Sequence, residues 1–172
     1  VFYYQYPTTF CSTAFNVMPL HLEKIAFPAV GPQPLNLSTR GLIGSGEDSL
    51  IGGFIVTGSD AKQIALRALG PSLSSSGISN PLADPAFTVY DSSGTAIAGN
   101  DDWQSDPAAS ELIASKLAPA DAAEAATIVT LNPAAYTLVV SGKDNVSGIG
   151  LVEIYDLSPS TPSKLANIST RG

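Results

Sequence analysis

One short acidic segment of the chain has residue types suited to binding a metal. The segment GNDDWQSD, residues 99–106, contains Asn100, Asp101, Asp102 and Asp106, and Ca²⁺ takes about six to eight oxygen ligands. The spacing is not that of an EF-hand loop, and Asp106 followed by Pro107 is typical of a helix N-cap. Asx residues also favour turns without any metal. We therefore assign no metal and no cofactor, and Ca²⁺ at the Asn100–Asp102 turn stays an open alternative.

Residues that could carry out nucleophilic catalysis are few. His21 is the only histidine and Cys11 is the only cysteine, and nothing in their spacing supports a catalytic pair. The glycine-rich segment GLIGSGED, residues 41–48, lacks the lysine of a phosphate-binding loop. Its two carboxylates, Glu47 and Asp48, would repel phosphate. We therefore expect no enzyme and name no catalytic residue.

The composition narrows the class of protein further. The formal net charge is −7, charged residues make up 13% of the chain, and the eight basic residues are scattered. Without a basic stripe, nucleic acid is not an expected partner. No apolar run approaches the roughly 20 residues needed to cross a bilayer. The single cysteine excludes an intrachain disulfide, and a first residue other than Met suggests a processed chain or a piece of a longer one.

Residues 1–34 differ from the rest of the chain. They contain five prolines, which argue against long helices and central strands. They also hold seven aromatic residues: Phe2, Tyr3, Tyr4, Tyr6, Phe10, Phe15 and Phe27. So much apolar surface on a short extended segment must be buried on its own domain, on a neighbour or at an interface.

From residue 35 the sequence predicts strands and turns. Strands are expected over 49–58, 62–70 and 148–157, with a bulge or close backbone approach at Gly52-Gly53. A hairpin is expected over 87–99, and a second one over 126–142 around Asn132-Pro133. A short helix is expected over 106–117, and Trp103 is expected to fill the core beneath the acidic turn. The pattern predicts an all-β protein, a β-sandwich or jelly-roll-like domain with one short helix.

A seven-residue motif occurs twice, near the start and at the end of this domain. Residues 35–41 read LNLSTRG and residues 166–172 read ANISTRG, so Asn36 and Asn167 are 131 residues apart. That separation suits one β-sandwich and is too long for a solenoid repeat. We therefore divide the chain into an extended segment, 1–34, and a repeat domain, 35–172, in which 167–172 restarts the motif. Arg40 and Arg171, at the centre of the two copies, would either pair locally or fix the contact between consecutive units.

The stretch from Asn36 to Leu157 resembles a tandem-repeated "NISTRG"-type β-sandwich domain of large secreted bacterial proteins. The resemblance rests on NLSTRG, LIGGFIVTG, ALRALGPSL, LADPAFTVYDSSGTAIAGNDDW and AAYTLVVSGKDNVSGIGLVEIYDL. The section from DPAFTVYDSSG to LNPAAYTLVVSG is more weakly similar to bacterial pre-peptidase C-terminal domains, which are extracellular β-sandwiches. Both resemblances imply an extracellular location and bring no catalytic residue.

These features predict a structural subunit of an extracellular, self-assembling filament. The N-terminal segment would add as a β-strand to the neighbouring subunit, head to tail, so that the chain's main partner is itself. The expected inter-subunit contacts are Phe2, Tyr3, Tyr4, Tyr6, Phe10, Phe15, Leu20, Leu22, Phe27, Arg40 and Arg171. The alternative is an extracellular binding module for carbohydrate or protein. Sugars on the sequons at Asn36, Asn145 and Asn167 stay an open question.

Overall fold

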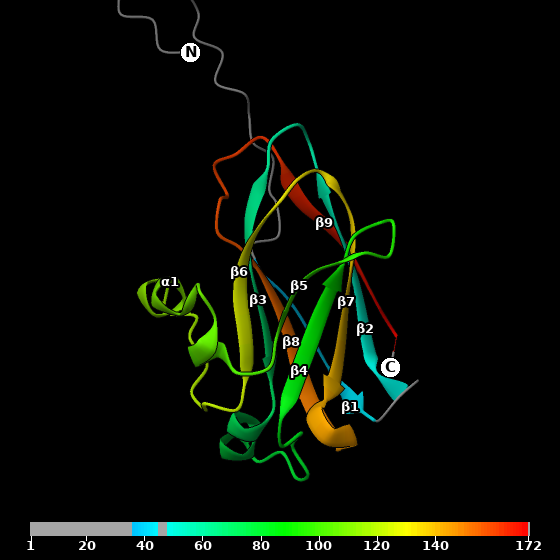
Figure 1. The fold of residues 1–172 in the computed structure, drawn as a ribbon, viewed down its shortest axis with the longest axis vertical. Helices are drawn as coiled ribbons and strands as arrows, with labels where there is room; N and C mark the ends of the chain where they lie inside the picture. The colour runs from blue at the N-terminus through cyan, green and yellow to red at the C-terminus, as the bar shows by residue number, and fades with distance from the viewer. Residues whose placement is uncertain (1–35, 45–47, 172) are drawn as a thin grey trace, which may run out of the picture.

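The computed structural model describes residues 36–44 and 48–171, which form two facing antiparallel sheets (Figure 1). Sheet A has the strand order β1-β8-β3-β6, and sheet B has the order β5-β4-β7-β2-β9. The strands are β1 (Asn36–Ile43), β2 (Leu50–Thr57), β3 (Lys62–Leu69), β4 (Pro85–Tyr90), β5 (Ala96–Asn100), β6 (Ala125–Leu131), β7 (Ala134–Gly142), β8 (Gly148–Asp156) and β9 (Lys164–Arg171). The expected all-β sandwich is confirmed. None of the described residues belongs to a helix long and apolar enough to cross a membrane.

Alternating apolar residues in the central strands produce the core between the sheets. Burial alternates along β4, β7 and β8, as expected for strands with one face toward a core. Phe54 and Leu138 from sheet B meet Leu66 and Ile154 from sheet A in one cluster of buried residues. Phe54 also stacks on Tyr136, with ring centroids 5.5 Å apart. The period-two pattern therefore identified the inward faces correctly.

The second predicted hairpin is wrong, because β6 and β7 belong to different sheets. β6 pairs with β3 in sheet A, whereas β7 pairs with β2 and β4 in sheet B. The Asn132-Pro133 turn carries the chain across the core, and the Tyr136 hydroxyl donates to the Asn132 carbonyl at 2.8 Å. The first predicted hairpin is confirmed as β4 paired with β5.

Gly53 is a position of close approach, as predicted for the glycine pair, whereas the bulge lies in the neighbouring strand β9, between Ala166 and Ile168. A Cβ at Gly53 would lie 2.8 Å from Ser169 Oγ on β9. The ladder between β2 and β7 is continuous, while the ladder between β2 and β9 shifts register between Phe54 and Ile55. A side chain at position 53 would therefore require the Ser169 side chain on β9 to move.

The predicted helix is shorter than expected. Helix α1 (Ala109–Ala114) begins after a turn in which the Ala108 N–H donates to Asp106 Oδ1 at 2.8 Å. It covers Trp103, which is 8% exposed and packs with Leu112. The Trp103 ring N–H donates to the Asp121 carbonyl at 3.0 Å. Trp103 therefore fills a small second core under α1, as predicted.

A buried ion pair fixes the end of sheet A. Lys62 Nζ lies 2.7 Å from Asp156 Oδ2, and both side chains are fully buried. The ammonium also donates to the Ser158 carbonyl at 3.0 Å and to Thr161 Oγ1 at 3.3 Å. Because a buried charge is tolerated only when paired and hydrogen-bonded, this network holds the loop that leads into β9.

Candidate functional site

The two copies of the repeated motif form the outermost strands on one side of the sandwich. β1 is the last strand of sheet A and β9 is the last strand of sheet B. We call this pair of strands the motif edge. In Figure 1 the C-terminal end of β9 lies on the opposite side of the molecule from α1. Each motif strand has a single partner among the described strands, β8 for β1 and β2 for β9.

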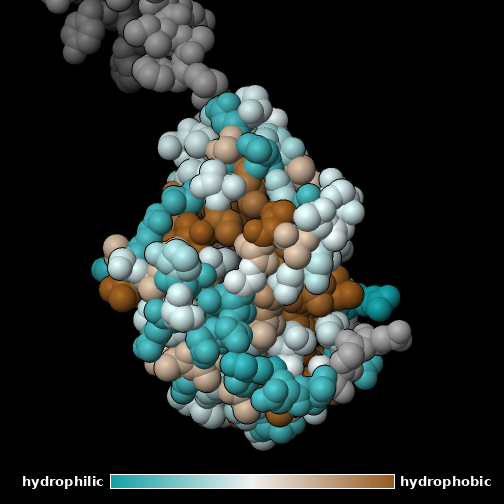
Figure 2. Space-filling view, in the orientation of Figure 1, coloured by the Kyte–Doolittle hydropathy of each residue, from teal (hydrophilic) through white to brown (hydrophobic). Residues whose placement is uncertain are grey.

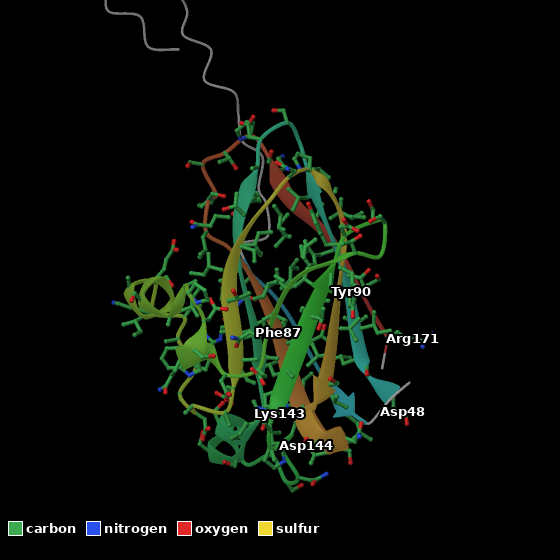
Figure 3. All side chains as sticks on the ribbon, viewed as in Figure 1. Asp48, Phe87, Tyr90, Lys143, Asp144 and Arg171 are labelled. Carbon is green, nitrogen blue, oxygen red and sulfur yellow. The ribbon has the colours of Figure 1, made fainter. Side chains whose placement is uncertain are left out.

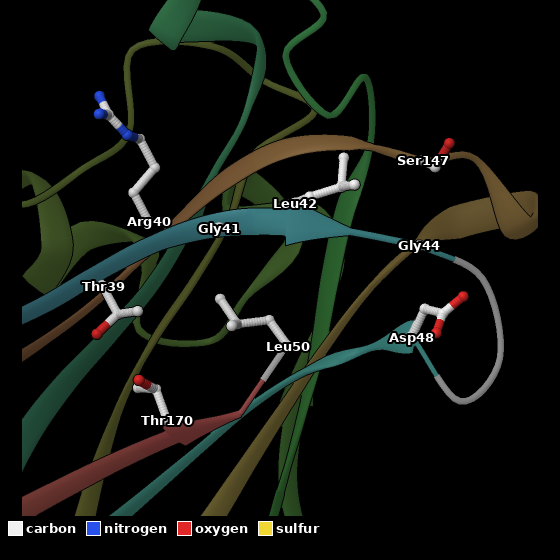
Figure 4. Close-up of a pocket in the computed structure, with 9 residues that line it drawn as sticks. All are labelled: Thr39, Arg40, Gly41, Leu42, Gly44, Asp48, Leu50, Ser147 and Thr170. Carbon is white, nitrogen blue, oxygen red and sulfur yellow. The ribbon is translucent and has the colours of Figure 1, made fainter.

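A cavity of about 760 Å³ opens at the motif edge (Figure 4). Thr39 and Thr170, equivalent residues of the two copies, face one another across it, and Leu50 lies to one side of them. The same two threonines also line a smaller hollow further in, whose floor includes Val152 and Ile154. The motif strands therefore lie at the same level, on the same side, with equivalent residues turned inward.

Backbone bonds at the end of β3 show which way the groups of sheet A point. The Gln63 carbonyl accepts from the Leu157 N–H at 3.0 Å, and the Gln63 N–H donates to Ser158 Oγ at 3.1 Å. The backbone of Gln63 is therefore directed toward β8. Successive residues of a strand direct their N–H and C=O to opposite edges, so Arg67 and its partner Glu153 also face one another.

The alternation continues from β8 into β1. Val152 must direct its backbone groups away from β3 and toward β1, where its partner is Thr39. Leu37 is directed in the same way. The N–H and C=O groups of Ser38 and Arg40 consequently point to the open side of the motif edge.

Sheet B follows the same rule from its other end. The Lys143 N–H donates to the Asp84 carbonyl at 2.8 Å, which directs the backbone of Lys143 toward β4. Leu138, an odd number of residues earlier in the chain, is therefore directed toward β2, where its partner is Gly52. Gly53 is then directed toward β9.

At equivalent positions of the motif, the backbone N–H and C=O groups of β9 point to the opposite edge from those of β1. The partner of Gly53 is Ser169, so Ser169 and Arg171 direct their backbone groups to β2. The groups of Ile168 and Thr170 are left facing the open side. The first copy of the motif thus exposes the backbone of its Ser and Arg, and the second exposes the backbone of its Ile and Thr. The two free edges are complementary in position.

The predicted contact residues fall into two groups. Arg40 and Arg171 are exposed on the outer faces of the motif strands, and Figure 3 shows Arg171 at the margin of the molecule. Neither guanidinium has an ion pair or hydrogen bond with a described residue, so local pairing, one of the two alternatives for these arginines, is not seen among the residues that the structure describes. The other predicted contacts lie outside the described residues: Phe2, Tyr3, Tyr4, Tyr6, Phe10, Phe15, Leu20, Leu22 and Phe27. The same is true of Cys11 and His21.

The acidic turn has partners within the protein. Asn100 accepts from the Ala126 N–H at 2.9 Å through Oδ1. Lys143 Nζ lies 3.0 Å from Asp101 Oδ2 and 3.8 Å from Asp102 Oδ2, and the hydrogen bond to Asp101 is the main cause of a raised pKa of Lys143. Within the described part of the chain, no three His, Cys, Asp or Glu side chains are grouped as a metal site would require. The turn therefore connects β5 to β6 and to the end of β7.

The opposite side of the sandwich, at β5 and β6, is only partly covered. Asn100 caps the start of the outer edge of β6, and α1 packs beside it. Beyond this cover lies a hollow of about 410 Å³, whose lining combines Ile97, Val129, Leu131 and Tyr136 with the polar residues Asp91, Thr130 and Asn132. Figure 2 shows hydrophobic surface on this face of the molecule. Ile97 is 42% exposed and sits where the ladder between β4 and β5 shifts register. We call this feature the β5–β6 hollow.

One solved structure shows what the fold of this chain is similar to. The structure is similar to the pre-peptidase C-terminal domain of collagenase from Bacillus anthracis, with 18% sequence identity and a TM-score of 0.43. The match covers 72% of this chain and 96% of that one. No family model matches the sequence, and no curated protein matches it. The "NISTRG" assignment has no counterpart among these comparisons.

Sequence reasoning named the two arginines but did not indicate that the two motif strands leave backbone groups at opposite free edges. The signal was present as the repetition itself. Its meaning depends on the topology, because only the placement of β1 and β9 on facing sheets shows that equivalent residues use opposite edges.

Proposed function

We propose that this chain is a structural subunit of an extracellular filament, joined head to tail by β-strand addition. The donor is the N-terminal segment, residues 1–34, and the acceptor is the β5–β6 hollow of the next subunit. In strand addition, backbone hydrogen bonds supply the affinity and alternate side chains enter pockets between the sheets. Leu20 and Leu22 have the spacing of such alternate side chains.

The observation that carries this proposal is apolar surface left open between two sheet edges. Val129 and Leu131 of β6 line the hollow, where Val129 is half-buried and Leu131 is buried, and Ile97 of β5 is exposed beside them. The outer edge of β6 has a described partner at Ala126, through Asn100, and the structure shows no such cap at Ile128 or Thr130. Free backbone groups beside uncovered apolar side chains are the two features that an added strand needs.

The positions of donor and acceptor favour a fibre rather than a closed ring or dimer. The N-terminal segment leads into β1, whereas the hollow lies at β5 and β6 on the other side of the sandwich. A contact between two different surfaces of identical subunits repeats along a line unless its rotation closes.

The test is light scattering coupled to size exclusion on the full chain, on a chain lacking residues 1–34, and on the variant Ile97→Glu. The matched control is Ile113→Glu, because Ile113 is 60% exposed on α1 and does not line the hollow. We expect polymers from the full chain and the control, and loss of polymers in the other two. A full chain that remains monomeric or dimeric at high concentration would refute the filament.

A second candidate function, an extracellular binding module, is favoured by the cavity at the motif edge. Its lining combines polar side chains, Thr39, Asp48, Ser147 and Thr170, with the apolar Leu50. Such a mixture is typical of small-molecule sites. Chemical-shift changes at these residues on titration with a panel of oligosaccharides, in a chain that stays monomeric, would support this function over the filament.

A further inference from the structure

We propose that the motif edge is a self-association interface, in which two copies of the chain meet across a two-fold axis parallel to the strands. β9 of each copy lies beside β1 of the other, in parallel, so that both sheets continue across the interface. This contact differs from the strand addition proposed above and does not depend on it.

The backbone of the two motif strands is complementary for parallel pairing. In a parallel pair, a residue that faces its neighbour bonds to the two residues flanking the position opposite it. With Thr170 placed opposite Thr39 of the second copy, the flanking residues are Ser38 and Arg40. These are the residues of β1 whose N–H and C=O groups face the open side, and Thr170 is a residue of β9 whose groups do so. Where the two strands overlap, over residues 36–40 of β1 and 167–171 of β9, the outward-facing groups of one strand meet those of the other.

The register follows from the level of the two strands within one molecule. Thr39 and Thr170 line the same cavity and the same inner hollow, and Figure 4 shows β1 and β9 running in the same direction. Rotation about an axis parallel to the strands leaves their level and direction unchanged. It therefore brings Thr170 of one copy opposite Thr39 of the other without any sliding.

The side chains match because the motif is repeated. Both threonines face inward and both Ser and Arg pairs are exposed on the outer faces. A shift of one residue would turn every side chain to the wrong face. In the proposed register, each motif residue of β9 lies beside the equivalent motif residue of β1. Each sheet would then run β5-β4-β7-β2-β9 from one copy into β1-β8-β3-β6 of the other. This pairing would cover the free edges of all four motif strands in the dimer, and covering an edge is a usual way in which proteins protect it.

This geometry has one unfavourable feature, which makes it testable. Arg40 of one copy lies beside Arg171 of the other on the outer face, and like charges on neighbouring strands are destabilising. Reversing one charge, by Arg171→Glu or by Arg40→Glu, would turn both repulsive contacts of the two-fold pair into attractive ones. We expect either single variant to dimerise roughly tenfold more tightly than the native chain. The double variant Arg40→Glu/Arg171→Glu should return to about the native affinity.

The direct test is disulfide cross-linking of the full chain, with Cys11→Ser as the background. Ser38→Cys and Ser169→Cys are made as separate single variants and mixed. Adjacent strands lie about 4.8 Å apart, within the range a disulfide spans. Under mild oxidation the mixture should give a covalent dimer on a non-reducing gel, and each variant alone should give only the background level.

The outcomes are separable from those of the filament. Removal of residues 1–34 should abolish polymers and leave this cross-link intact. Thermal melting of both cysteine variants, in the reduced state, confirms that the sandwich is folded. No excess cross-link in the mixture, or tighter association in neither charge variant, would overturn the proposal.

Discussion

A pair of proline substitutions on adjacent residues of β9 tests the backbone assignment at the motif edge. Proline removes one N–H, and in a sheet it is tolerated where that N–H faces solvent. Ser169→Pro removes an N–H directed to β2, whereas Thr170→Pro removes one directed to the open side. Both positions lie in extended backbone, so the ring and its effect on the preceding residue cost about the same in each.

The expected difference between these variants is one hydrogen bond and one orphaned acceptor. A net hydrogen bond contributes about 1 kcal/mol, and leaving its partner unsatisfied adds about 1 kcal/mol at a half-exposed edge. Ser169→Pro should therefore lower the free energy of unfolding by about 2 kcal/mol, and Thr170→Pro by less than about 0.5 kcal/mol. For a domain of this size, that corresponds to a Tm roughly 6–8 °C lower for Ser169→Pro.

The assay is urea unfolding followed by circular dichroism, with thermal melts in parallel. Ser169→Ala and Thr170→Ala serve as controls, because they remove the side chains and keep both N–H groups. Measurements at low protein concentration keep self-association out of the comparison. If the two proline variants lose equal stability, or if Thr170→Pro loses more, the alternation that we derive for β9 is wrong.

Three further predictions concern the buried polar groups and the β4–β5 turn. Asp156→Ala should lower the free energy of unfolding, measured with urea, by about 3–5 kcal/mol, because it leaves the fully buried ammonium of Lys62 without its partner. The double variant Lys62→Met/Asp156→Leu should recover most of this loss. A double variant as unstable as the single one would contradict the pairing argument. Glu124→Ala should lower the free energy of unfolding by about 2–4 kcal/mol in the same measurement, because its buried Oε1 accepts hydrogen bonds from the N–H groups of Gly70 and Ser72. A loss within error of zero would show that these two N–H groups form hydrogen bonds with water instead. The pKa of Asp91 is lowered chiefly by the hydrogen bond that its carboxylate accepts from the side chain of Ser93. The carboxylate should therefore stabilise the native chain over Asp91→Asn above its ordinary pKa of 3.8, and the difference in Tm should shrink as pH falls through the lowered value; a difference independent of pH would contradict this.

The strands and their inward faces could be predicted from the sequence because period-two alternation is local. β7 illustrates this, since Tyr136, Leu138 and Val140 alternate with more exposed residues within one short segment and all three are buried. The burial of Trp103 was also predictable, because a single large apolar side chain next to a polar turn and the start of a helix is expected to pack beneath them. These features depend only on residues close together in the chain.

The assignment of strands to sheets could not be predicted in the same way. Two strands around Asn132-Pro133 give the same local pattern whether they pair with each other or cross between sheets. The ion pair between Lys62 and Asp156 joins residues 94 positions apart, and nothing near either residue indicates its partner. The complementary edges of β1 and β9 depend on the complete strand order, so they became visible only with the structure.

The strand order also has a consequence for how the chain folds. β1 pairs with β8, and β2 is completed by β9, so each sheet joins an early strand to a late one. Pairing across such long loops is slow, because the entropy of closing the loop is lost before the contacts form. During synthesis, β1 has no partner strand until β8 has been made, and β9, which carries the second copy of the motif, is made later still. Sheet B is therefore incomplete until β9, the last of the described strands along the chain, has been synthesised.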